Sequence, residues 1–327
     1  MPDDGGWGDD ANDADDSWGR DEEGRDDGDR GADGDDAWTA DEGWDDPPGV
    51  GADEAPAAPT GHVPTVGRPP REGWLWAVGT GVGLSVATVV ATLAVLLPVS
   101  LLIVEGGITL SPVVSTLLSL ALIQYVAFGA VIVGYLRYRE TTVRAYVAAR
   151  VPSLRDVGAA LGGWVLAFVL AIAVGTVIQS LGLTGGTNNS AEAGMQDPEI
   201  FLVLIPAAFL VIGPMEELLF RGTVQGRLRE TLSPVPAVAV SALLFAAVHA
   251  PLAVQGTLAQ RLTTVGLLFF PSLVFGGLYE YTDNIVVPAL VHALYDATLF
   301  VLLYVVVVYG PEEAGSGSEA VLALFGL

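Results

Sequence analysis

The chain of 327 residues combines 51% hydrophobic residues with a formal net charge of −24, although only 16% of its residues are charged. Charge and apolarity must therefore lie in different parts of the chain, so the length expected of a soluble domain does not apply to the apolar part. The sequence contains no cysteine, which excludes disulfides, thiolate catalysis and Cys-ligated zinc or iron–sulfur sites.

Residues 1–72 are predicted to form a disordered acidic tail. Residues 1–60 hold more than half of the 38 acidic residues of the chain, and such one-sided charge with low hydrophobicity is typical of disorder. Four tryptophans in this run are either docking motifs for a partner or incidental members of a solvating tail: Trp7, Trp18, Trp38 and Trp44. The chain has no lysine, and its acidity suggests either a high-salt cytoplasm or high genomic GC content.

From Trp74 onward the sequence consists of long apolar runs, each near the about 20 residues needed to cross a bilayer. In lipid, a helix forms its backbone hydrogen bonds within its own segment, so we predict that all of these runs are helical. The predicted fold is an all-α, polytopic transmembrane bundle of about seven or eight spans. The number depends on whether the last run is continuous or broken in two. This transmembrane domain covers residues 73–309, and a short tail covers residues 310–327. The predicted spans are 74–103, 113–136, 157–181, 199–220, 235–253, 262–280 and 285–309.

The arginines predict the orientation of these spans. The connection 137–155 carries five arginines, whereas 104–112 and 182–198 carry none, so the positive-inside rule places 137–155 in the cytoplasm. Arg68 and Arg71 put the N-terminus on the same side, and only Arg261 goes against the pattern. We therefore expect a multi-pass protein of the cell membrane with a cytoplasmic N-terminus. The first residues lack the basic region of a signal peptide, so the first span should be retained.

Ionisable residues inside spans are rare and costly, at about 2.5–3.5 kcal/mol each on insertion scales, and here they cluster in the later spans. In the fourth span, Pro214 is expected to kink the helix just before Glu216 and Glu217. Glu217 and Arg221 are four residues apart, so they share a helix face and can pair. Glu216 points about 100° away from Glu217 and is free for another partner.

Two of the three histidines of the chain lie in the fifth and seventh apolar runs. His249 follows Phe245 by four residues, and His292 precedes Asp296 by four, which places that His–Asp pair on one helix face. A carboxylate beside a histidine can activate water as a general base, and a second histidine can stabilise an oxyanion. The same set would also suit zinc, although the zincin motif HExxH is absent.

These motifs, in this order on successive spans, resemble the CPBP family of CAAX prenyl endopeptidases of the Rce1 type and bacteriocin-processing or Abi proteins. The resemblance covers roughly residues 199–300 and rests on Glu216, Glu217, Arg221, Phe245, His249, His292 and Asp296. It implies an intramembrane endopeptidase in which Glu216, assisted by His249, activates water. It further implies that Glu217 paired to Arg221 supports the base, and that His292 and position 296 bind the oxyanion.

Position 296 departs from the pattern, because the family commonly has Asn there and an ionised aspartate offers no donor. Asp296 could be protonated, could orient His292, or could ligate a metal. Asp296 in place of Asn favours a metal, so His249, His292 and Asp296 are candidate ligands for a possible Zn²⁺, while a metal-free mechanism is also compatible.

Three functions stay open at this point. The first is cleavage of a peptide or of a membrane-anchored or lipidated protein at the bilayer. The second is a proton- or ion-coupled transporter, and the third is a non-catalytic immunity or scaffold protein of the same fold. The lipid bilayer is the expected environment, nucleic acid is not an expected partner, and the acidic tail could bind a partner of its own.

Overall fold

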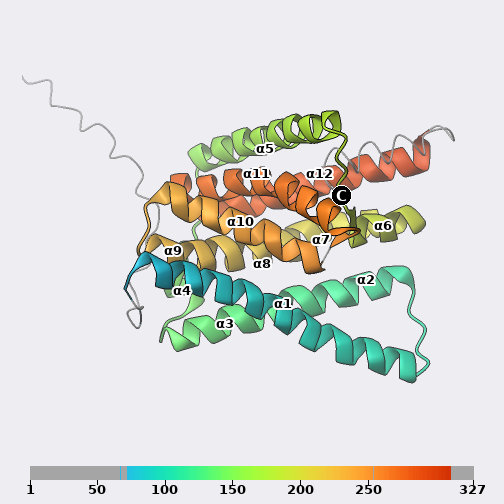
Figure 1. The fold of residues 1–327 in the computed structure, drawn as a ribbon, viewed down its shortest axis with the longest axis horizontal. Helices are drawn as coiled ribbons and strands as arrows, with labels where there is room; N and C mark the ends of the chain where they lie inside the picture. Colours follow the sequence, from blue (N-terminus) through green and yellow to red (C-terminus); the bar gives the residue numbers. More distant parts are fainter. Residues whose placement is uncertain (1–66, 68–71, 253, 311–327) are drawn as a thin grey trace, which may run out of the picture. The chain divides into compact units, whose positions relative to one another are not determined.

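The computed structural model describes residue 67, residues 72–252 and residues 254–310 (Figure 1). The predicted acidic tail, apart from residues 67 and 72, and the C-terminal tail beyond Gly310 lie outside the described residues. Within the described part, seven helices are long and apolar enough to cross a membrane, and the strands are limited to one short pair. The all-α, polytopic transmembrane fold is therefore confirmed.

The spans follow one another in chain order, and several are assembled from shorter helical segments. Three of these segments, η1, η2 and η3, are π-helical. The spans are α1 (Trp74–Glu105), α2–η1–α3 (Pro112–Ala121, Leu122–Phe128, Gly129–Tyr138), α5 (Leu154–Ser180), α7–η2–α8–η3–α9 (Glu199–Ala207, Ala208–Ile212, Gly213–Glu217, Leu218–Gln225, Gly226–Arg229), α10 (Pro234–Leu252), α11 (Leu258–Thr282) and α12 (Val286–Tyr309).

The short elements lie in the connections between spans. Helix α4 (Val143–Tyr146) follows the second span, and α6 (Asn189–Gln196) precedes the fourth. Strand β1 (Thr187–Asn188) pairs antiparallel with β2 (Val254–Gln255), which ties the connection before α6 to the connection before α11.

The fourth span is longer than predicted. It continues through α9 to Arg229 instead of ending at residue 220, and the last span, α12, is unbroken. The arginines of α9 do not mark a helix end in water, because Arg227 pairs with Glu230 at 3.2 Å and Arg229 with Glu280 at 2.9 Å. Protein carboxylates replace water as their partners, so the helix can extend past the predicted boundary.

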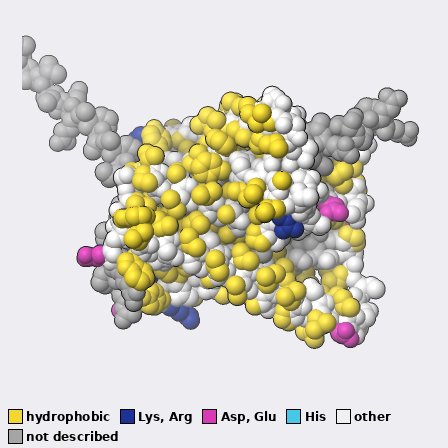
Figure 2. Space-filling model, in the orientation of Figure 1, with side chains coloured by type: hydrophobic (Ala, Val, Ile, Leu, Met, Phe, Trp, Pro, Cys, Tyr) yellow, Lys and Arg dark blue, Asp and Glu magenta, His cyan; other side chains and the backbone are white. Residues whose placement is uncertain are grey.

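The fourth span is packed on several sides by the other spans. Segment α8 contacts α12 and η1, and η3 contacts α10, while α5 packs against α11 and α12 (Figure 1). Large hydrophobic side chains such as Leu97, Leu102 and Leu210 remain exposed on the outer faces of the helices. Figure 2 shows hydrophobic side chains spread across the visible face with few charged ones. Such a surface is suited to lipid rather than to water.

Candidate active site

The two adjacent glutamates of the fourth span lie in a short α-helical segment, α8, between π-helical segments η2 and η3. Pro214 lacks the N–H that would bond one turn back, and the wider turn of η2 lies directly before it. A Cβ added to Gly213 would lie 2.7 Å from the Ala289 carbonyl oxygen and 3.1 Å from the Ala293 Cβ. Only glycine therefore allows α8 to come this close to α12, the helix that carries His292.

Glu217 joins two of the predicted motifs. Its Oε2 lies 3.0 Å from Arg221 Nε, which confirms the predicted pair within the fourth span. Its Oε1 accepts a hydrogen bond of 2.8 Å from His292 Nδ1. Both Glu217 and Arg221 are fully buried, so this carboxylate is held by a cation on its own helix and by an imidazole from α12.

Arg221 is held by groups from two other helices. Its Nη2 donates to the Ser272 hydroxyl at 2.8 Å and to the Ser272 carbonyl at 3.0 Å. The guanidinium lies 4.8 Å from the centre of the Phe245 ring and 5.5 Å from that of Phe275, within the range of cation–π attraction. Arg221 therefore links the fourth span to α10 and α11 beside the site.

Glu216 lies where three other spans meet. Its Oε1 accepts a 2.8 Å hydrogen bond from Gln124 Nε2, which comes from η1. Its Oε2 lies 3.9 Å from His249 Nε2 and 3.9 Å from His292 Nε2. The two oxygens therefore have different surroundings: one is hydrogen-bonded to an amide, and the other faces two imidazole rings.

The orientation of both imidazole rings is set by their Nδ1 partners. His249 Nδ1 lies 2.8 Å from the Phe245 carbonyl oxygen, and a carbonyl can only accept, so Nδ1 carries a proton there. His292 Nδ1 donates to Glu217 in the same way, and its ring stacks on Phe275 with centroids 4.9 Å apart. In both residues Nε2 is thus the nitrogen turned toward Glu216. Asp296 Oδ2 lies 3.5 Å from His292 Nε2, in line with the predicted shared face.

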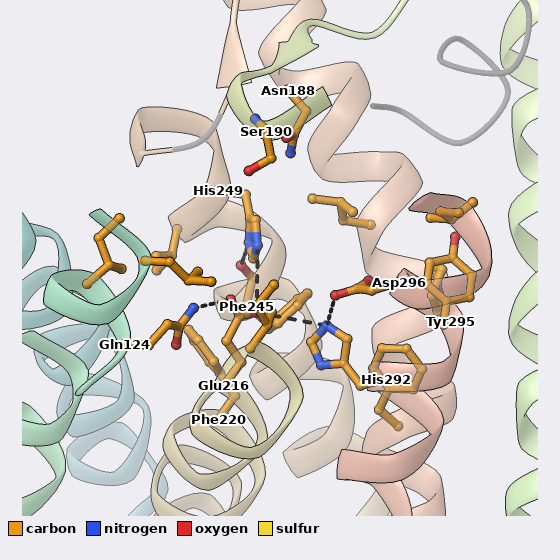
Figure 3. Close-up of a pocket in the computed structure, with 18 of the residues that line it drawn as sticks. Gln124, Asn188, Ser190, Glu216, Phe220, Phe245, His249, His292, Tyr295 and Asp296 are labelled. Carbon is orange, nitrogen blue, oxygen red and sulfur yellow. Dashed lines mark hydrogen bonds and ion pairs between the residues drawn. The ribbon is translucent and has the colours of Figure 1, made fainter. Parts of the chain in front are cut away.

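A cavity of about 200 Å³ is lined by Gln124, Glu216, His249, His292 and Asp296 (Figure 3). Its walls are largely apolar and include Leu120, Ile123, Leu268, Leu299 and Phe300. In Figure 3, Glu216 and His292 lie at one end, and Asn188 and Ser190 lie at the other, beyond His249. Such a cavity can hold a short apolar stretch of chain against a few convergent polar groups.

The spacing of Glu216 from the two histidines does not match a tetrahedral zinc site, whereas His292 Nε2 and Asp296 Oδ2, 3.5 Å apart, would subtend about 117° at such an ion. Two atoms 3.9 Å apart would subtend about 145° at an ion bound at about 2.0–2.1 Å from each, far from tetrahedral. Among the described residues, no three His, Asp or Glu side chains are grouped so that they could hold a metal ion. A water oxygen at about 2.8 Å from both atoms would subtend about 90°, which hydrogen bonding tolerates. Zinc stays a prediction of the sequence, and no catalytic step is assigned to it.

Sequence reasoning did not find several residues of the site. Gln124, Ser272 and Phe275 come from spans without a motif, and Asn188 and Ser190 come from a connection. A signal existed for Gln124, because it is a lone amide within a long apolar run and therefore needs a buried partner. The position of that partner on another span could not be read from the sequence.

Part of the chain is similar to a known protein family. Residues 198–298 match the family model described as Type II CAAX prenyl endopeptidase Rce1-like. Neither the curated proteins nor the solved structures gave a match. The matched segment holds Glu216, Glu217, His249, His292 and Asp296. The chain is therefore a multi-pass membrane protein whose residues 198–298 are similar to the Rce1-like protease family.

Proposed function

We propose that this protein is an intramembrane endopeptidase that hydrolyses a peptide bond with a water molecule activated by Glu216. The observation that carries the proposal is the position of Glu216 Oε2, which lies 3.9 Å from each of two imidazole nitrogens at the end of a largely apolar cavity. The similarity of the matched segment to a protease family supports the same reaction class.

Water is activated between Glu216 and His249. A water molecule hydrogen-bonded to Glu216 Oε2 and to His249 Nε2 passes a proton to the carboxylate as its oxygen attacks the carbonyl carbon of the substrate. The bond from His249 Nδ1 to the Phe245 carbonyl keeps Nε2 turned to that water. The walls of the cavity limit competing water, which strengthens each electrostatic contact.

His292 stabilises the oxyanion that results. Its Nε2 donates to the negative oxygen, while the Glu217 carboxylate at Nδ1 compensates the positive charge of the ring. Arg221 in turn compensates Glu217 and keeps it in place. When the tetrahedral intermediate collapses, the C–N bond breaks and Glu216 returns its proton to the leaving amine, so the carboxylate is regenerated.

The family implies a membrane-associated protein substrate. The apolar walls of the cavity suit the apolar residues of a peptide or of a membrane-anchored or lipidated chain near its cleavage site. The arginine distribution supports a cytoplasmic N-terminus, with the connection 137–155 on the same side.

Peptidase assays of purified protein against Glu216→Gln test the proposal. The variant keeps the side-chain volume but cannot take the proton, so cleavage should fall by at least about 10²-fold. Glu280→Gln is the matched control, because the Glu280 carboxylate is also largely buried but binds Arg229 and Gln225 away from the cavity. Undiminished cleavage by folded Glu216→Gln would refute the assignment of the base.

A further inference from the structure

Gln124 is the feature of the site that neither the motifs nor the family match accounts for. It lies in η1 on the second span, outside the matched residues 198–298. The residue is 3% exposed, and its Nε2 donates to Glu216 Oε1 at 2.8 Å. Within the described residues, this is the one hydrogen bond that the Glu216 side chain makes.

The orientation of the Gln124 amide is set by Glu216. The amide oxygen of Gln124 is buried without a hydrogen-bond partner among the described residues. Turning the amide over would place that oxygen against the Glu216 carboxylate and would remove the donor from it. The amide N–H faces Glu216 because a carboxylate oxygen can only accept, and this orientation leaves the amide oxygen unpaired.

This contact distinguishes the two oxygens of the carboxylate. Oε1 is engaged by the Gln124 amide, whereas Oε2 faces His249 and His292. A carboxylate on a glutamate side chain can rotate about its last bond, and a donor on one oxygen restricts the orientation of the carboxylate plane. One carboxylate oxygen of Glu216 therefore faces the cavity while the other is held by Gln124.

We propose that Gln124 is a positioning residue, whose amide N–H holds Glu216 Oε1 so that Oε2 is the atom that takes the proton from water. The inference rests on the proposed function of Glu216. It makes the second span part of the catalytic unit, since η1 packs directly against α8. The matched segment would then be incomplete without the second span.

The test compares two variants of Gln124 with a matched control. Gln124→Met keeps the length and removes the donor, and Gln124→Glu puts a second carboxylate beside the first. Gln225→Met is the control, because Gln225 is also buried and also donates to a carboxylate, that of Glu280, at 2.9 Å. Each protein is assayed for kcat, KM and the pH profile of kcat/KM, and its thermal stability is measured.

We expect Gln124→Met to lower kcat by about 10- to 100-fold with KM nearly unchanged, because one charge-assisted hydrogen bond is lost. The acid limb of its pH profile should move to higher pH, and further in Gln124→Glu, where two carboxylates compete for one proton. His249, His292 and Asp296 also face Glu216 but are unaltered in every variant. Gln225→Met should leave kcat and the profile as in the parent protein.

A parent-like kcat and pH profile in Gln124→Met would overturn the inference, and so would an equal change in Gln225→Met. Glu216→Gln, assayed in parallel, separates this failure from that of the proposed function. If Glu216→Gln is inactive while Gln124→Met behaves as the parent protein, only the positioning role of Gln124 is refuted. If Glu216→Gln still cleaves, Glu216 is not the base, and the positioning role of Gln124 is refuted as well.

Discussion

Arg221→Met should destabilise the protein strongly, because it leaves a carboxylate buried without its cation. Arg221 and Glu217 are fully buried and 3.0 Å apart, so no solvent can replace the lost charge. Removing one partner of such a pair costs about 3–5 kcal/mol. This free-energy cost includes the loss of the two hydrogen bonds to Ser272 and of the ring contacts with Phe245 and Phe275.

The double variant Glu217→Gln/Arg221→Met isolates the charge effect. It removes both charges, and the amide oxygen introduced at position 217 can still accept from His292 Nδ1, so stability should return to within about 2 kcal/mol of the parent protein. Arg155→Met provides a control, since Arg155 is exposed over the Tyr281 ring and should contribute less than about 1 kcal/mol.

Reversible unfolding in detergent micelles measures the three differences. A loss below about 1 kcal/mol in Arg221→Met would show that the pair behaves like a solvated surface bridge. A double variant as unstable as the single one would show that packing, and not the unpaired charge, accounts for the loss. Either result would refute the reasoning.

Three further predictions concern helix approach, the last site residue and orientation. Gly213→Ala should separate α8 from α12 and lower kcat, whereas Gly134→Ala, with open space around it, should not; equal activities would contradict the close-approach argument. Asp296→Asn should retain cleavage because an amide can donate to the oxyanion; loss of activity in step with bound zinc, measured by metal analysis, would contradict this. In the cysteine-free chain, Thr184→Cys should react with an impermeant maleimide on intact cells and Ala145→Cys only after lysis; the reverse pattern would invert the topology.

The sequence predicts the features that depend on the period of a single helix. The seven spans, the Glu217–Arg221 pair and the shared face of His292 and Asp296 all depend on local spacing, and the structure contains them. Contacts between helices depend on rotation and depth, which local spacing does not determine. The bonds from Glu217 to His292 and from Gln124 to Glu216 are of this kind. The predicted end of the fourth span is wrong because Arg227 pairs with Glu230 at the end of the same helix and Arg229 with Glu280 of α11, and neither arginine depends on water.

The π-helical segment η2 means that the site depends on the winding of the fourth span as well as on the identities of its residues. A π-helical turn holds one residue more than an α-helical turn at the same position. If all residues of Ala208–Ile212 wound as a regular α-helix, Glu216 and Glu217 would be rotated by about 100° relative to α12, whereas deleting one residue would restore regular winding and keep the direction of both carboxylates. Homologous chains that share the motif can therefore differ by one residue before it, and grafting this segment onto a uniform helix would turn both carboxylates away from the cavity.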